Sequence, residues 1–199
     1  MIGSNELRKV RETLEYFADL VRSQATKPEL EFERLLDGYF ETRRILAHQF
    51  SLLSHEYLLK GDTILASTLS RVETRMGELF GERIPRRYLV VGGYKGIHPI
   101  LLEYLSQHVG EPVRSSKLRV LTGDQTHTER RVRDLRDLGF AVEWKKSAGE
   151  DQYELQYLEP DLDKAARLHV RRNIVKDKSL DQRRKDELLA IVDALHSPK

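Results

Sequence analysis

The residues with the clearest chemical potential lie in the basic stretch from Thr126 to Lys146, THTERRVRDLRDLGFAVEWKK. It holds six Lys and Arg residues among regularly spaced apolar ones. The planar fork of an arginine matches a phosphate or the edge of a guanine, so this chemistry suits an acidic partner such as a nucleic acid. The alternative is a solvated helix whose charges pair internally, because Glu129, Arg133 and Asp137 lie at i,i+4 spacing.

Two further patterns resemble phosphate chemistry, but both are incomplete. Glu143-x-Lys145 has the spacing of PD-(D/E)xK nucleases, in which an Asp on an adjoining strand completes a Mg²⁺ site. The upstream Asp124 is expected to cap a helix instead, and the run PDLDK at 160–164 follows the pair. The run GGYKG at 92–96 lacks the spacing of a P-loop. No catalytic motif is complete, so a nuclease activity would need a further domain, and we expect neither a cofactor nor a bound metal.

Charge is distributed unevenly along the 199 residues. The net charge is only +2, and residues 1–85 hold 12 Lys and Arg against 14 Asp and Glu. Residues 164–185, in contrast, hold nine Lys and Arg against two acids. This asymmetry indicates that the C-terminal half meets a polyanion.

The composition also restricts where the protein works. The chain has no cysteine, which excludes disulfides and thiolate zinc sites and fits a reducing cytoplasm. The N-terminus becomes charged at once and has no apolar signal core, and no run of about 18 apolar residues could span a membrane. We therefore expect a cytoplasmic protein with no membrane partner.

Three apolar stripes with spacings of three and four residues precede Pro85, and each predicts a helix. Stripes of this kind pack lengthwise, so we expect a helical bundle over residues 1–84. The long second stripe carries more apolar area than one short partner covers, so we also expect a homodimer through this region. The stripes are Leu7, Val10, Leu14, Phe17 and Val21; Phe32, Leu36, Tyr39, Leu46, Phe50, Leu53 and Tyr57; and Leu65, Leu69, Val72, Met76 and Leu79.

A Gly- and Pro-rich segment separates this region from the rest of the chain. Residues 85–96 contain Pro85 and three glycines around the apolar run 88–91. We expect a linker with a short strand at 88–91.

From Ile97 to Pro160 the pattern predicts helix, short helix, turn, helix and hairpin. The first helix ends at Gly110. The second begins at Ser115 or Ser116, and the third, capped by Asp124 or Thr126, ends at Gly139. Alternating residues at 140–146 and 152–158 then flank a turn at Gly149, with Phe140, Val142 and Trp144 pointing to one side.

This order resembles the winged helix-turn-helix family over residues 97–160. The run GEPVRSSKLRVLTGDQTHTERRVRDLRDLGFAVEW is similar to modules that accompany HNH nuclease domains in restriction endonucleases, although the HNH motif itself is absent here. The resemblance implies a mainly α fold with a small β-hairpin and sequence-specific binding of double-stranded DNA. The chain would be the recognition part of a restriction-endonuclease-like protein. The alternatives are a small transcriptional regulator that acts by occupancy and a winged helix that binds only proteins.

The helix wheel separates a buried from an exposed face of the third helix. Thr128, Val132, Leu135 and Leu138 form the buried face, with Arg131 near its edge. Early residues of this helix would reach base edges, while the preceding helix start and the hairpin would hold phosphates. The candidate DNA-binding residues are Ser115, Ser116, Lys117, Gln125, Thr126, His127, Arg130, Arg131, Arg133, Arg136, Lys145, Lys146, Arg171 and Arg172.

Residues 161–199 are expected to form a basic helical extension. Ser179 can cap a helix whose inward residues are Leu180, Leu188, Ile191 and Leu195. Arg171 and Arg172 would add phosphate contacts, and the alternative is a charged surface helix.

Overall fold

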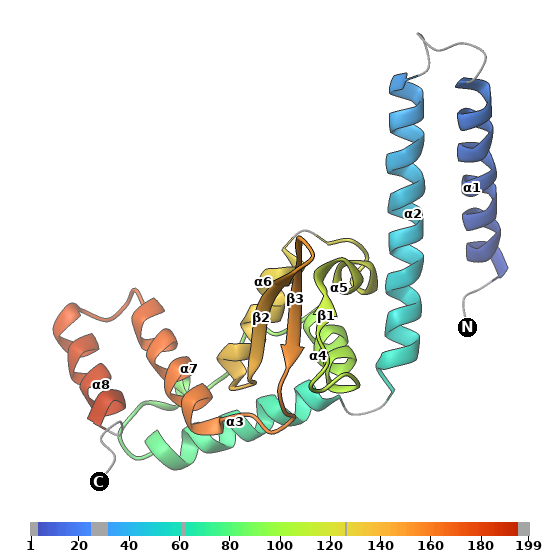
Figure 1. Ribbon diagram of the computed structural model, residues 1–199. Coiled ribbons are helices and arrows are strands. Elements are labelled where there is room, and N and C mark those ends of the chain that lie inside the picture. The colour runs from blue at the N-terminus through green and yellow to red at the C-terminus, as the bar shows by residue number, and fades with distance from the viewer. Residues whose placement is uncertain (1–3, 25–31, 61–62, 126, 195–199) are drawn as a thin grey trace.

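The computed structural model describes residues 4–24, 32–60, 63–125 and 127–194. The described chain is mainly helical with one small antiparallel sheet of three strands, which confirms the expected fold class. Figure 1 shows the elements in order. They are α1 (Ser4–Gln24), α2 (Phe32–Leu58), α3 (Ile64–Phe80), the 3₁₀ helix η1 (Arg86–Tyr88), α4 (His98–Ser106), β1 (Val113–Arg114), α5 (Ser115–Leu121), α6 (Thr128–Asp134), the 3₁₀ helix η2 (Leu135–Leu138), β2 (Val142–Ser147), β3 (Glu150–Leu155), α7 (Leu162–Lys176) and α8 (Gln182–Ala194).

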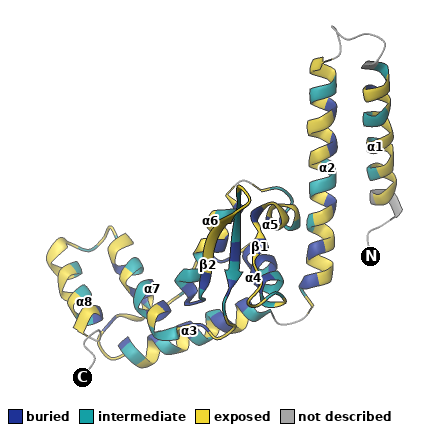
Figure 2. Cartoon of the chain, viewed as in Figure 1, coloured by how far each residue is buried: buried dark blue, intermediate teal, exposed yellow. Residues whose placement is uncertain are grey.

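Helices α1 and α2 form an extended hairpin that projects from the rest of the molecule (Figure 1). Gly38 is buried in it, and a Cβ there would lie 2.5 Å from Leu20 Cδ1, so the glycine allows a close approach of the two helices. Most of the hairpin is exposed or half-buried (Figure 2). The apolar residues expected to face inward but found exposed are Leu7, Leu14, Val21, Phe32, Tyr39, Phe50, Leu53 and Tyr57. The buried positions of α2 are instead Gly38, Thr42, Gln49, Ser54 and Leu58.

Helix α3 does not join α1 and α2 in a bundle. Thr63 caps its start by accepting from the Ala66 amide, and the helix then lies against α4 and α7. Its Leu65 belongs to a core built by α4, α5, α6 and the sheet. Its Val72 and Met76 belong to a second core with η1, α7 and α8. The apolar stripe of α3 is thus covered by the C-terminal part of the chain and not by the α1–α2 hairpin.

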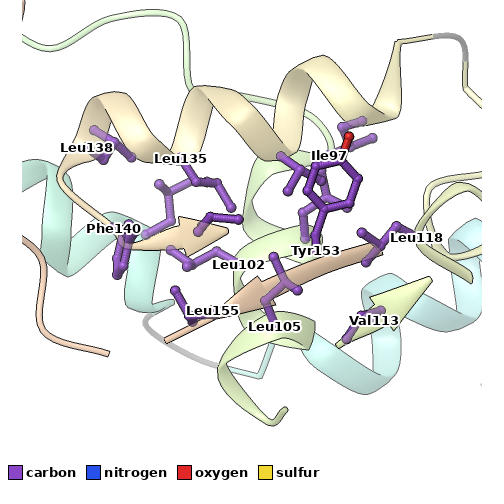
Figure 3. Close-up of a cluster of buried hydrophobic side chains, with 14 of the residues drawn as sticks. Ile97, Leu102, Leu105, Val113, Leu118, Leu135, Leu138, Phe140, Tyr153 and Leu155 are labelled. Atoms are coloured by element: carbon purple, nitrogen blue, oxygen red, sulfur yellow. The ribbon is translucent and has the colours of Figure 1, made fainter. Parts of the chain in front are cut away.

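The sheet has the strand order β1-β3-β2, and all pairings are antiparallel. The expected hairpin is confirmed: β2 and β3 are joined at Ala148 and Gly149, whose φ angles are 50° and 80°. Two consecutive positive φ angles give the tight turn that suits the twist of antiparallel strands. The short strand β1 was not expected, because two residues are too few to show an alternating pattern. Side chains from the sheet, α4, α5, α6 and η2 meet in one core (Figure 3).

The linker region and the C-terminus differ from expectation in local detail. No strand forms at 88–91, because Asn173 Nδ2 donates to the carbonyls of Tyr88 and Val90. Helix α8 begins after Asp181, whose carboxylate accepts from the Arg184 amide at 2.7 Å, so Asp181 rather than Ser179 caps it. Leu188 is buried as expected, and Leu195 lies outside the described residues.

Among the residues that the structure describes, every helix is too short or too polar to cross a lipid bilayer.

Candidate nucleic-acid interface

A tight turn connects α5 to α6 and holds the two helices together. Thr122, at the end of α5, has no exposed surface, and its hydroxyl lies 3.0 Å from that of Thr128. Thr128 also donates to the carbonyl of Gln125 at 2.9 Å. Gly123 and Asp124 have φ angles of 72° and 56°, so Asp124 belongs to the turn and does not cap α6 as expected.

The start of α6 also differs from expectation. His127 occupies the cap position in a left-handed conformation, with φ 70° and no side-chain capping bond. Gln125 and His127 are exposed beside the turn. The other expected cap, Thr126, lies outside the described residues.

Helix α6 and η2 present one buried and one exposed face. Thr128, Val132, Leu135 and Leu138 are all buried, as the helix wheel predicted. Arg131 does not lie at the buried edge: its side chain is exposed, and Nη1 donates to Asp134 Oδ2 at 3.2 Å.

Two arginines of α6, Arg130 and Arg133, are exposed and have no ion-pair partner among the described residues. The i,i+4 pairs expected as an alternative do not form. Glu129 pairs with Arg119 of α5, and Asp137 pairs with Arg172 of α7. The helix therefore presents two guanidinium groups to solvent, because its own acids are held by other elements.

The start of α5 is only partly available to a phosphate. The amide of Ser116 donates to Glu150 Oε1 at 3.1 Å, and bonds from Ser116 lower the pKa of that carboxyl. Ser115 is buried. Lys117 is exposed, and its Nζ lies 5.6 Å from the centre of the Tyr104 ring. Of these three residues, Lys117 is thus the one whose side chain offers an exposed positive charge to a phosphate.

The β2–β3 hairpin carries two further basic residues on β2. Lys145 pairs with Glu154 across the hairpin, whereas Lys146 is exposed and has no ion pair among the described residues. Val142 is buried as expected, but Trp144 on the same side is 52% exposed. The core ends at Val142, and Trp144 extends beyond it.

Trp144 lines a pocket of about 400 Å³ between the hairpin and the α6–η2 segment. Trp144 is not among the candidate DNA-binding residues predicted from the sequence. The sequence pattern that could have identified it is an aromatic residue two positions after the last buried residue on the same side of an alternating strand. The pocket is lined by Glu129, Arg133, Arg136, Trp144, Asp151 and Tyr153. Arg136 is half-buried there, and its Nε donates to the carbonyl of Val142 at 2.5 Å.

The basic residues of α7 are held by acids within the chain. Arg171 Nη1 lies 2.7 and 3.0 Å from the two carboxylate oxygens of Asp193 on α8. Arg172 pairs with Asp137 on η2. Neither of these two arginines is brought together with the uncommitted arginines of α6.

A buried polar network supports the C-terminal end of α6. His98 Nε2 lies 3.4 Å from Asp134 Oδ2, and the Tyr94 hydroxyl lies 3.3 Å from His169 Nε2. Both histidines are almost completely buried. Burial lowers the pKa of His169, which keeps its ring neutral at neutral pH. The Tyr94 hydroxyl also donates to the carbonyl of Asp134 at 3.3 Å, so the network connects the end of α6 to α4 and α7.

The arrangement does not provide an evident metal site. Within the four described ranges, no three His, Asp or Glu side chains converge as metal ligands would. Glu143 and Lys145 are exposed on β2, and Lys145 is occupied by Glu154. Asp124, the upstream acid considered for a nuclease site, pairs with Arg43 of α2.

The comparison with known families matches the same part of the chain. Residues 100–161, from the first turn of α4 to the cap residue of α7, match the model of the KpnI N-terminal domain. This relates the segment to a restriction-enzyme-related domain and fits a DNA-associated role. No curated protein and no solved structure matches the chain significantly.

Proposed function

We propose that residues 97–160 form a winged helix-turn-helix that binds double-stranded DNA in a sequence-specific manner. The order α4, β1, α5, α6, β2 and β3 is that of a helix-turn-helix followed by a two-stranded wing. In this proposal α6 enters the major groove and the β2–β3 hairpin is the wing. The observation that carries it is the uncommitted pair Arg130 and Arg133 on the exposed face of α6.

The environments of the other candidates assign them different roles. Gln125 and His127 lie exposed at the start of α6, where side chains of such helices reach base edges. Lys117 on α5 and Lys146 on β2 are exposed cations and would contact the phosphate backbone. Lys145, Arg171 and Arg172 are each held by an acid, so DNA would have to compete with that acid for them.

We infer that the chain is the DNA-recognition part of a restriction-endonuclease-like protein. The match of residues 100–161 to a restriction-enzyme-related domain supports this choice over a transcriptional regulator. The test is selection of bound duplexes from a random library, followed by incubation of the complex with Mg²⁺. An enriched motif supports sequence-specific recognition, whereas a pool that stays random contradicts it. Cleavage of the selected duplex would show that this chain carries its own catalytic site.

A second proposal concerns assembly: the α1–α2 hairpin forms a homodimer. Large exposed apolar side chains gather on it, and a groove of about 740 Å³ extends this apolar surface to α5. Exposed apolar patches of this kind mark interaction sites, and a self-complementary helical hairpin can pair with its own copy. The exposed residues are Leu7, Leu14, Tyr16, Val21, Phe32, Tyr39, Phe40, Phe50, Leu52, Leu53 and Tyr57.

The hairpin is attached to the α5–α6 turn, so a dimer would control the spacing of two DNA-binding units. Arg43 of α2 pairs with Asp124 of the turn. A Cβ on Gly123 would lie 3.1 Å from Ser51 Cβ and 3.3 Å from the carbonyl of Ala47. A twofold dimer joined in this way should select a palindromic site whose half-sites are separated by whole helical turns.

A further inference from the structure

The pocket between α6 and the β2–β3 hairpin has a composition that a phosphate contact does not explain. Trp144 and Tyr153 are cross-strand partners, so their side chains project from the same face of the sheet. Figure 3 shows Tyr153 extending from β3 towards α6. Tyr153 is only 3% exposed and Trp144 is 52% exposed. The pocket thus has two neighbouring aromatic side chains, one buried and one exposed.

Three groups in this pocket lack partners within the described chain. Arg133 and Asp151 form no ion pair or hydrogen bond there, and the Tyr153 hydroxyl forms no hydrogen bond. Burial, and then the charges of Glu129 and Asp151, raise the pKa of Tyr153, so its hydroxyl is protonated and can donate. The pocket therefore offers a guanidinium and a hydroxyl as donors, a carboxylate as acceptor and an indole face for stacking.

These groups indicate the chemical class of the ligand. The pocket wall holds two guanidiniums, Arg133 and Arg136, against two carboxylates, Glu129 and Asp151, so it has no excess of positive charge to hold a phosphate. A flat, uncharged ring with donors and acceptors on its edge satisfies all the free groups. The carboxylate of Asp151 would accept from an exocyclic amino group, as acidic side chains do with cytosine. The volume of about 400 Å³ is within the range of small-ligand pockets and admits one base.

We propose that this pocket receives a single unstacked nucleobase bearing an exocyclic amino group, taken from the DNA that α6 binds. The inference rests on the proposed function and specifies which residues would read one position of the site. Trp144 stacks on the base, Asp151 accepts from its amino group, and Arg133 donates to its ring nitrogen or carbonyl. Enzymes that extrude a base from the helix recognise it in the same way, by stacking and by contacts to its pairing edge.

The experiment uses the full chain and its selected duplex, with fluorescence anisotropy of labelled DNA to measure affinity. A single mismatch is placed at each position of the site in turn. A mismatched base is easier to unstack, so wild-type affinity should rise about tenfold at one position. Trp144→Ala should abolish this rise, and Glu143→Gln, an exposed position on the opposite face of the same strand, should retain it. Circular dichroism checks that the variants remain folded.

Trp144 is the single tryptophan of the chain, so the intrinsic tryptophan fluorescence of the protein reports on this pocket. Stacking on a base should quench its fluorescence when DNA binds, and Asp151→Asn should weaken discrimination at the mismatch-sensitive position while leaving the quenching in place. Affinity that never rises with any mismatch, in a protein that still binds DNA, overturns the pocket but leaves the proposed function intact. Absence of DNA binding in the anisotropy measurement overturns both.

Discussion

Arg119 of α5 pairs with Glu129 of α6, and this contact removes from Arg133 an acid that lies four residues away on the same helix. Arg133, which we propose contacts bases, therefore lacks an ion-pair partner in the described part of the chain because Arg119 of the preceding helix binds Glu129. Arg172 acts similarly on the other side, because it pairs with Asp137, the second acid within reach of Arg133.

Arg119→Ala should weaken DNA binding, although Arg119 itself need not contact DNA. Glu129 would then be free to pair with Arg133, and an i,i+4 pair stabilises by about 0.5 kcal/mol, which predicts a loss of affinity of about twofold. Fluorescence anisotropy at low salt measures the effect. The double variant Arg119→Ala, Glu129→Gln should regain the lost affinity. If the double variant binds as weakly as the single one, Arg119 contacts DNA directly.

Arg133→Ala should cost about 1–3 kcal/mol on the preferred duplex and relax the base preference at one position. Arg130→Ala should do the same at another position. The measurement is binding to a panel of single-substitution duplexes. Lys146→Ala is the matched control, since it should weaken binding to all members of the panel alike. A changed preference in Lys146→Ala, with an unchanged one in both arginine variants, would reverse the assignment of base and phosphate contacts.

The face that α6 buries could be predicted from the sequence, whereas the partners of its acids could not. Thr128, Val132, Leu135 and Leu138 follow the helical period, and tertiary packing buries all four. Helical spacing identifies only neighbours within the same helix. Arg119 and Arg172 come from α5 and α7, and nothing in the local pattern of α6 indicates that they reach its acids.

The N-terminal region shows a different limit of sequence patterns. A stripe tells which face of a helix is apolar but not which element covers it. Helix α3 has the predicted apolar stripe. However, its Val72 and Met76 pack against α7, more than 80 residues further along the chain, and not against the preceding helices. Helix α2 buries Gly38 and Thr42 instead of Tyr39, because close helix packing favours small side chains.

DNA affinity should fall steeply as salt concentration rises, because Lys and Arg contacts to phosphates release bound counterions. The plot of log affinity against log salt should be linear, with a negative slope of about 0.9 per phosphate contact. Lys146→Ala should reduce the steepness by about one contact. Arg171→Ala should leave it unchanged, because Asp193 already holds that guanidinium. A slope near zero in the wild type would contradict DNA binding.

The free energy of unfolding should decrease at acidic pH because of Asp177. This carboxylate accepts hydrogen bonds from Tyr88 of the linker and from Ser179. Bonds from Ser179 and then from Tyr88 lower the pKa of this carboxyl from 3.8 to about 2. A carboxyl whose pKa is lower in the folded state stabilises the fold above its ordinary pKa, and this contribution is lost as the pH falls from about 4 towards 2. Urea unfolding followed across that range should show the decline in the wild type. Asp177→Asn should start less stable at neutral pH and show a smaller decline, and equal slopes for both proteins would contradict the role of Asp177.

Charged substitutions on the α1–α2 hairpin should weaken the proposed homodimer. Tyr57 is 72% exposed and Phe50 is 47% exposed on the apolar side of α2, so a charge at either position should repel a second copy without disturbing the interior. The wild type should scatter light as a dimer at tens of micromolar, while Phe50→Glu and Tyr57→Glu should shift it towards the monomer. Glu56→Gln is the control, because it changes charge beside Tyr57 without adding an acid to the apolar surface. Circular dichroism separates loss of the dimer from loss of the fold. A wild-type monomer at this concentration, together with an asymmetric selected DNA site, would contradict both the dimer and the palindrome.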